Sequence, residues 1–159
     1  MLKSLYLRLA ATALLCFSAF FSHASTDTIL TINHHGEEAK FSLEQLLTHA
    51  DKEIVTDTPW TEDKTTFMGV SAKEILKITA TDKASLKVTA LNDYWSTIPY
   101  SDIEQYNPIF AVKKNGDVMS IRDKGPVWVI YPLSQFDEMN NEVLHSRMVW
   151  QVRSVEIVQ

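Results

Sequence analysis

The chain has 159 residues, of which 45% are apolar and 22% are charged, and its formal net charge at pH 7 is −5. An acidic chain without a basic run is a poor candidate for binding nucleic acid or anionic membranes. Its single cysteine excludes a disulfide framework.

The N-terminal segment has the pattern of a cleavable export signal. Lys3 and Arg8 precede an apolar run over residues 10–21, and Ser22-His23-Ala24 supplies small residues at positions −3 and −1 of a cleavage site. A retained membrane anchor is the alternative, but the run is short for a transmembrane helix. The absence of an Arg-Arg pair favours a Sec-type route for an unfolded chain over the twin-arginine route. We therefore expect a periplasmic protein without membrane insertion after cleavage of residues 1–24.

The mature chain is expected to be a single domain over residues 25–159. Cleavage removes Lys3, Arg8 and Cys16, which leaves 13 basic and 20 acidic residues and no cysteine. The mature protein then has no thiolate to bind a metal or to act as a nucleophile.

The first half of this domain is predicted to mix short strands and short helices. Ser42-Leu-Glu-Gln45 and Ser71-Ala-Lys-Glu74 are capping boxes, the pattern that opens a helix. An irregular stretch around Pro59-Trp60 lies between them. The predicted elements are strands over residues 29–33 and 53–57 and helices over about 42–48 and 71–78.

The second half is predicted to be richer in strands. Ser101-Asp-Ile-Glu104 is a third capping box, for a single helical turn, and Asn115-Gly116 predicts a tight hairpin turn. Residues 133–146 are expected to form a polar loop. The predicted strands cover residues 85–91, 94–98, 109–113, 118–121, 127–131 and 148–158. We therefore predict an α+β fold, with a mixed β-sheet or barrel-like core and a few short helices.

The common catalytic motifs HExxH, CxxC, GxSxG, GxGxxG and the P-loop do not occur in the sequence. His34-His35 suggests a metal site, but adjacent residues of a strand point to opposite faces, and Gly36 favours a solvated turn. No metal ligand and no catalytic residue is therefore predicted.

Three segments combine aromatic rings with polar groups at expected loops, where a rigid β-scaffold commonly carries its binding sites. They are Thr56-Asp57-Thr58-Pro59-Trp60, Asn92-Asp93-Tyr94-Trp95, and Arg122-Asp123-Lys124-Gly125-Pro126 before the strand that carries Trp128. A flat heterocycle fits such a set, because rings stack on the aromatic side chains while carboxylates or amides bind the ring edge. The alternative is that Trp60, Trp95 and Trp128 are core residues.

Five segments of the sequence, in order, match the motifs of one known domain family. Phe67-Met-Gly-Val70 and the helix ending in Ile75-Leu76 match a W-x-G-V-x-L-x-x-L-L segment, and Asn92-Asp-Tyr94 with Ile98-Pro99 matches an S-x-D-G-Y-x-x-x-I/L-P strand pair. The other three are the hairpin at 109–116, the loop and strand at 124–132, and the closing strand at 150–157. Together they resemble the sulfite-oxidase-type molybdopterin-binding domain family. The resemblance runs from about Leu30 to Val158 and implies that family's fold.

The sequence departs from the family at its metal-binding position. Enzymes of the family bind molybdenum through one cysteine, in a segment that reads C-V-E-x-W in short members. Trp60 matches that tryptophan, which places the cysteine position near Thr56. A neutral hydroxyl is a poor substitute for a thiolate on this metal. The arginine of the family's G-x-P-x-R loop is also replaced, by Trp128 or Val129.

The resemblance therefore implies a binding protein without a tightly bound cofactor, similar to periplasmic pterin-binding proteins that regulate biofilm formation. Such a protein signals its ligand state to the periplasmic domain of a membrane-bound cyclic-di-GMP enzyme of the GGDEF/EAL type. Trp60, Tyr94 or Trp95 would stack on the pterin, and Asp57 or Asp93 would bind its guanidine-like edge. Arg122 and Lys124 would contact its side chain or ring carbonyl. The alternatives are a molybdopterin-dependent oxidoreductase with a non-cysteine metal ligand, and a scaffold that binds only protein.

Overall fold

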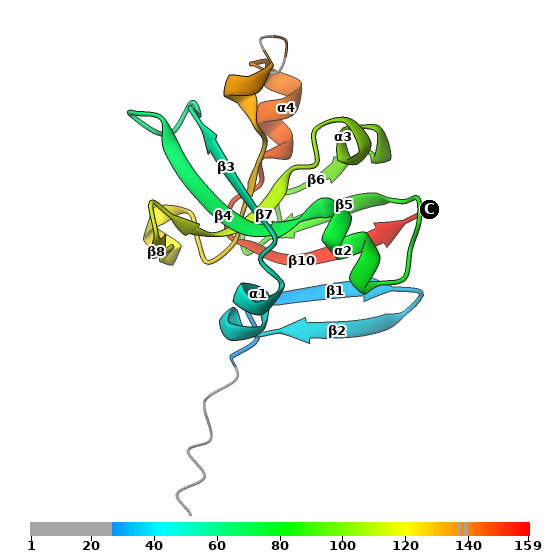
Figure 1. The fold of residues 1–159 in the computed structure, drawn as a ribbon. Coiled ribbons are helices and arrows are strands. Elements are labelled where there is room, and N and C mark those ends of the chain that lie inside the picture. The colour runs from blue at the N-terminus through cyan, green and yellow to red at the C-terminus, as the bar shows by residue number, and fades with distance from the viewer. Residues whose placement is uncertain (1–26, 137, 139) are drawn as a thin grey trace, which may run out of the picture.

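In the computed structural model, residues 27–136, 138 and 140–159 are described (Figure 1). The expected signal peptide, with Cys16, lies outside the described residues. The fold is α+β, with short helices packed on two sheets. None of the described helices is long and apolar enough to cross a bilayer.

The first sheet is mixed, and its strand order is β2-β1-β10-β5-β6. Its central pair, β1 and β10, is parallel, and its other neighbours are antiparallel. The strands are β1 (Leu30–His34), β2 (Glu37–Phe41), β5 (Ser85–Ala90), β6 (Trp95–Ile98) and β10 (Val152–Val158).

The second sheet is antiparallel, in the order β3-β4-β7-β8, with β9 also paired to β7. Its strands are β3 (Lys52–Thr56), β4 (Thr65–Ser71), β7 (Ile109–Lys114), β8 (Asp117–Val118) and β9 (Trp128–Ile130). Both sheets are open, which corrects the barrel-like core suggested by the sequence: each has edge strands that pair on one side only, so neither closes on itself.

Four α-helices and two 3-10 turns connect the strands within the described residues. They are α1 (Leu43–His49), α2 (Ala72–Ile78), α3 (Tyr100–Gln105), α4 (Glu142–Arg147), η1 (Ile121–Asp123) and η2 (Leu133–Gln135). Between the sheets lies one apolar cluster, whose largest fully buried side chains are Trp128, Tyr131, Phe67 and Phe110.

Two of the three predicted capping residues cap their helices. Ser42 and Gln45 form both reciprocal bonds of a capping box, and Ser71 accepts from the Glu74 backbone N–H at 3.1 Å. The third prediction is wrong, because the N-cap of α3 is Pro99, two residues before Ser101, and Ser101 lies inside the helix. The predicted Asn115-Gly116 turn is confirmed, with φ angles of 50° and 90°.

The expected polar loop over residues 133–146 contains η2 and α4, which corrects that prediction. Asn141 caps α4 by accepting from the Leu144 N–H at 3.0 Å, and Leu144 is the buried residue of this helix. The predicted strand at 118–121 shortens to β8 and is followed by η1, and the closing strand begins at Val152 rather than Met148.

Candidate binding site

The described residues enclose an aromatic pocket of about 330 Å³ between the end of β5, the start of β6 and α4. We call it the aromatic pocket. Its lining consists of aromatic and apolar side chains with a few polar groups: Trp60, Ala90, Asn92, Tyr94, His145, Ser146, Met148, Val149 and Trp150.

The rings in this pocket meet edge to face, with Trp60 at their centre. Its ring centroid lies 5.2 Å from that of Trp150 at an interplanar angle of 70°, and 5.9 Å from that of His145 at 69°. On a third side it lies 6.0 Å from the buried Trp128. Such contacts stabilise the rings mutually, so Trp60 and Trp150 form a fixed, half-buried apolar surface.

Local hydrogen bonds position the loop that carries Trp60. The Thr58 hydroxyl accepts from the Trp60 N–H at 3.2 Å, and the Thr61 hydroxyl accepts from the Thr58 N–H at 3.1 Å. Tyr94 is fixed at the opposite side, because its hydroxyl donates to the Ser146 carbonyl of α4 at 2.8 Å. The pocket therefore depends on three chain segments that only the folded structure brings together.

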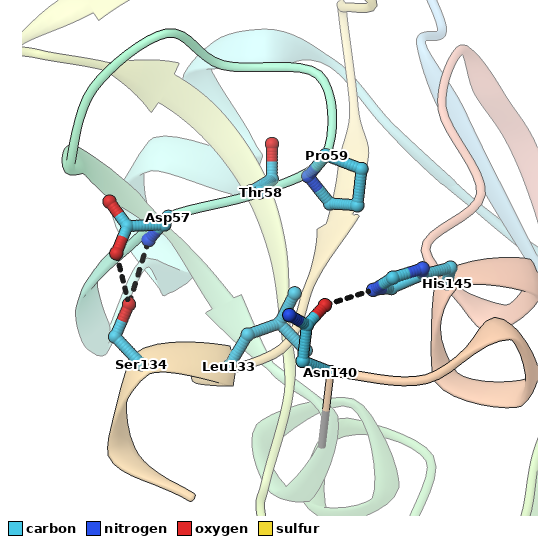
Figure 2. A pocket seen from close by; sticks show the side chains of 7 residues that line it. All are labelled: Asp57, Thr58, Pro59, Leu133, Ser134, Asn140 and His145. Atoms are coloured by element: carbon cyan, nitrogen blue, oxygen red, sulfur yellow. Dashed lines mark hydrogen bonds between the residues drawn. The ribbon is translucent and has the colours of Figure 1, made fainter. Parts of the chain in front are cut away.

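A second, polar pocket of about 540 Å³ adjoins the first, because His145 lines both. We call it the polar pocket; Figure 2 shows its lining residues, Asp57, Thr58, Pro59, Leu133, Ser134, Asn140 and His145. In this view Asp57 and Ser134 lie on one side, and on the other Asn140 Oδ1 lies 3.0 Å from His145 Nε2.

Thr56 and Ser134 join β3 to η2 behind the polar pocket. Thr56 is fully buried, and its hydroxyl donates to the Asp57 carbonyl at 3.0 Å and accepts from the Ser134 N–H at 3.0 Å. The Ser134 hydroxyl accepts from the Asp57 N–H at 2.8 Å and donates to Asp57 Oδ2 at 3.1 Å. Asp57 is thereby oriented at the pocket wall.

A buried carboxylate anchors α4, which carries His145 and Ser146. Asp102 of α3 is 7% exposed and pairs with Arg147 at 2.7 Å. Tyr131 also donates its hydroxyl to this carboxylate at 2.8 Å. Burial, and next the Asp102 carboxylate, raise the pKa of Tyr131 well above its ordinary value, so this hydroxyl stays protonated.

Five of the nine sequence-predicted site residues lie in or against the two pockets. Trp60 and Tyr94 line the aromatic pocket and Asp57 lines the polar pocket. Trp128 is a core residue behind Trp60, as the core-packing alternative expected, and donates its indole N–H to the Met148 carbonyl at 3.1 Å. Thr56 lies behind the polar pocket rather than in its lining.

The other four predicted residues line neither pocket. Asp93 pairs with Arg153 at 2.7 Å, and Trp95 is 59% exposed with the Lys87 ammonium 5.6 Å from its ring centroid. Arg122 is exposed on η1. The Lys124 ammonium lies 4.9 Å from the Trp150 ring centroid, behind the aromatic pocket's lining.

Sequence reasoning missed Trp150 and Ser146 as site residues, singled out Asn92 only as part of the segment 92–95, and found no spacing that required His145 to line a pocket. Trp150 was visible as part of the closing-strand motif, but it lies before β10, where Gln151 has a φ of 52° and breaks the alternation. The expectation for His34 and His35 was half right: Gly36 lies in a turn, but the two rings lie 4.1 Å apart because His35 has left the strand. Among the described residues no group of three or more His, Cys, Asp or Glu side chains is placed to hold a metal.

Comparisons with known proteins show the fold. No protein-family model matches the sequence, and no curated protein matches it. A solved structure that does match is that of the sulfane dehydrogenase SoxCD from Paracoccus pantotrophus, with a TM-score of 0.61 and 16% sequence identity. The match covers 84% of this chain and 38% of that chain, so this protein spans well under half of the dehydrogenase chain.

Proposed function

We propose that this protein is a non-catalytic binding protein for a pterin or a similar flat heterocycle. The observation that carries the proposal is the aromatic pocket, in which Trp60, Tyr94 and Trp150 offer ring surfaces. Its volume of about 330 Å³ lies at the small end of the range for ligand pockets, which suits a two-ring ligand. Asn92, His145 and Ser146 supply polar groups for the ring edge.

The residues at the position of the family's metal ligand do not fit molybdenum. Residues 25–159 contain no cysteine, and the Thr56 hydroxyl is buried and hydrogen-bonded to Asp57 and Ser134. A neutral, fully hydrogen-bonded hydroxyl does not replace a thiolate on a soft metal site. We therefore derive no redox step for this protein.

An oxidoreductase remains the second candidate, because the fold is similar to that of a sulfane dehydrogenase. It would require a non-cysteine metal ligand. Molybdenum analysis of protein purified from its native host decides between the two candidates. Stoichiometric molybdenum would overturn the binding-protein proposal; molybdenum well below one atom per chain supports it.

We further propose that the protein acts in the periplasm and presents its bound form to the periplasmic domain of a membrane-bound GGDEF/EAL enzyme. The support is the export-signal pattern and the family resemblance described above. Pull-down of such a domain by the tagged protein, with and without pterin, tests the partnership. Equal capture in both conditions would contradict ligand-dependent signalling.

Ligand binding is tested by titrating the purified protein with 7,8-dihydro-6-hydroxymethylpterin. Because Trp60 and Trp150 lie in the pocket, binding should quench tryptophan emission and release heat in a calorimeter. We expect saturation with a Kd of roughly micromolar, about −8 kcal/mol. No heat and no quenching up to millimolar pterin would favour the third candidate, a scaffold whose pocket serves only protein contacts.

A further inference from the structure

The two pockets share His145. Among the described residues, neither is lined by a lysine or an arginine that could pair with the phosphate of a phosphorylated ligand. We propose that they are two subsites of one cleft: the aromatic pocket takes the ring, and the polar pocket takes an uncharged, hydroxyl- or amino-bearing substituent. The protein thus selects unphosphorylated ligands over their phosphate esters. This inference rests on the proposed binding function.

His145 makes the two pockets continuous. Its ring lies 5.9 Å from the Trp60 ring in the aromatic pocket, while its Nε2 lies 3.0 Å from Asn140 Oδ1 in the polar pocket. A substituent that leaves a ring stacked near Trp60 therefore passes this imidazole and reaches the opposite wall, which Asp57 and Ser134 form (Figure 2).

Asp57 supplies the one carboxylate among the described lining residues of the polar pocket. Its Oδ2 accepts from the Ser134 hydroxyl, and Asn140 contributes an amide whose Oδ1 lies 3.0 Å from His145 Nε2. A carboxylate accepts from hydroxyl or amino groups, whereas a phosphate brings a charge of about −1.5 to −2 at pH 7 and only acceptors, unless it is protonated. The phosphate would therefore meet repulsion at Asp57.

Among the described residues, neither pocket is lined by a lysine or an arginine that would offset that repulsion. Two cations beside the lining residues are engaged elsewhere. Arg147 pairs with Asp102, and Lys124 lies over the rings of Trp150 and Trp128, at 4.9 Å and 5.8 Å from their centroids. The competing binding mode is therefore one in which the substituent extends toward Lys124 instead of Asp57.

Calorimetry with 6-hydroxymethylpterin and its phosphate monoester distinguishes the binding mode toward Asp57 from the one toward Lys124. At low ionic strength we expect the phosphate to bind at least about tenfold more weakly, a difference of about 1.4 kcal/mol. High salt should narrow the difference, because it screens the Asp57 charge. Asp57→Asn should remove most of the difference in affinity between the two compounds. It should still bind 6-hydroxymethylpterin, since the amide preserves the shape of the side chain and one acceptor.

Glu62→Gln is the matched control, because Glu62 is exposed on the same β3–β4 connection and lines neither pocket. It should leave the ratio of the two Kd values within twofold of wild type. Lys124→Gln should also leave the ratio unchanged.

If the phosphate ester bound as tightly as the parent pterin or more tightly, the inference would be overturned. Loss of that binding in Lys124→Gln would then place the substituent on the Lys124 side. Binding of both compounds with unchanged discrimination in Asp57→Asn would overturn it as well. In both cases the proposed pterin-binding function survives. Absence of binding by both compounds would overturn that function, and this inference with it.

Discussion

The Arg147 guanidinium lies 2.7 Å from the Asp102 carboxylate and thereby fixes α4 to α3. Because α4 carries His145 and Ser146, this ion pair holds a wall that the aromatic and polar pockets share. Stability of the fold and the shape of the site are therefore coupled through one partly buried pair.

Arg147→Met should lower the free energy of unfolding by about 2 kcal/mol, because it leaves the Asp102 carboxylate buried with one partner fewer. The estimate lies below the usual range for buried pairs because the Arg147 side chain is 24% exposed. Urea unfolding measures the loss. Glu156→Gln breaks the exposed pair with Lys87 and should cost below about 1 kcal/mol; an equal loss in both variants would contradict the assignment.

Tyr131→Phe should destabilise the protein at pH 8 by about 1.5 kcal/mol, because Asp102 loses a hydrogen bond. The pKa of Tyr131 is raised in the folded state. Above pH 10.0, its ordinary pKa, the tyrosine therefore ionises in the unfolded chain and stays protonated in the folded protein. Wild-type stability then falls as pH rises, by about 1.4 kcal/mol per pH unit, and the variant has no hydroxyl to ionise.

The gap between wild type and Tyr131→Phe should therefore be constant below pH 10 and close near about pH 11. Urea unfolding of both proteins between pH 8 and 11 measures it. A gap that stays constant through this range would show that the Tyr131 hydroxyl is not held in its protonated form.

Trp150→Ala should weaken pterin binding by at least about fivefold, because one stacking surface is worth about 1–3 kcal/mol. Trp95→Ala is the matched control: Trp95 is 59% exposed and lines neither pocket, so its loss should leave the affinity within twofold. Fluorescence titration compares the variants, with near-UV circular dichroism to confirm that each is folded. A larger loss of affinity in Trp95→Ala than in Trp150→Ala would show that the pterin binds at the outer face of β6 instead.

Thr56→Val should cost about 1–3 kcal/mol although the two side chains have the same shape, because the Ser134 N–H loses its acceptor in a partly buried place. Thr56→Ser keeps the hydroxyl and should recover most of that loss. Thermal unfolding ranks the three proteins. If valine were neutral, the β3–η2 hydrogen bonds would not orient Asp57 as described.

Gly69→Ala should destabilise β4 by about 3 kcal/mol or more, because a Cβ there collides with the Phe110 carbonyl oxygen on β7. Gly36→Ala meets no atom within 4 Å and is strained only through its φ of +85°, for about 1 kcal/mol. Soluble yield and urea midpoints distinguish the two. A mild effect at Gly69 would show that β4 and β7 separate easily.

The sequence predicted elements whose signals are local. The Ser42–Gln45 capping box and the Asn115-Gly116 turn are confirmed because their geometry is decided within four residues. Elements held by tertiary pairing were missed. In β2 four of the five residues are exposed, and pairing with β1 rather than apolar alternation makes it a strand.

The candidate site was predictable only in part, for the same reason. Trp60 and Tyr94 stood out as aromatic residues at expected loops, and both line the aromatic pocket. Asp93 and Trp95 belong to the same segment as Tyr94, but successive side chains diverge at this turn, where Asp93 has a φ of 67°. The contribution of α4 depends on the Asp102–Arg147 pair across 45 residues, which no local pattern indicates.

The position of β10 sets the order in which this fold can assemble. The last strand of the chain lies between β1 and β5 and joins the two halves of its sheet. Without β10, the β1–β2 and β5–β6 hairpins have no strand that pairs them with each other. The first sheet, and with it the aromatic pocket whose Trp150 leads into β10, therefore forms only once β10 has paired with both hairpins.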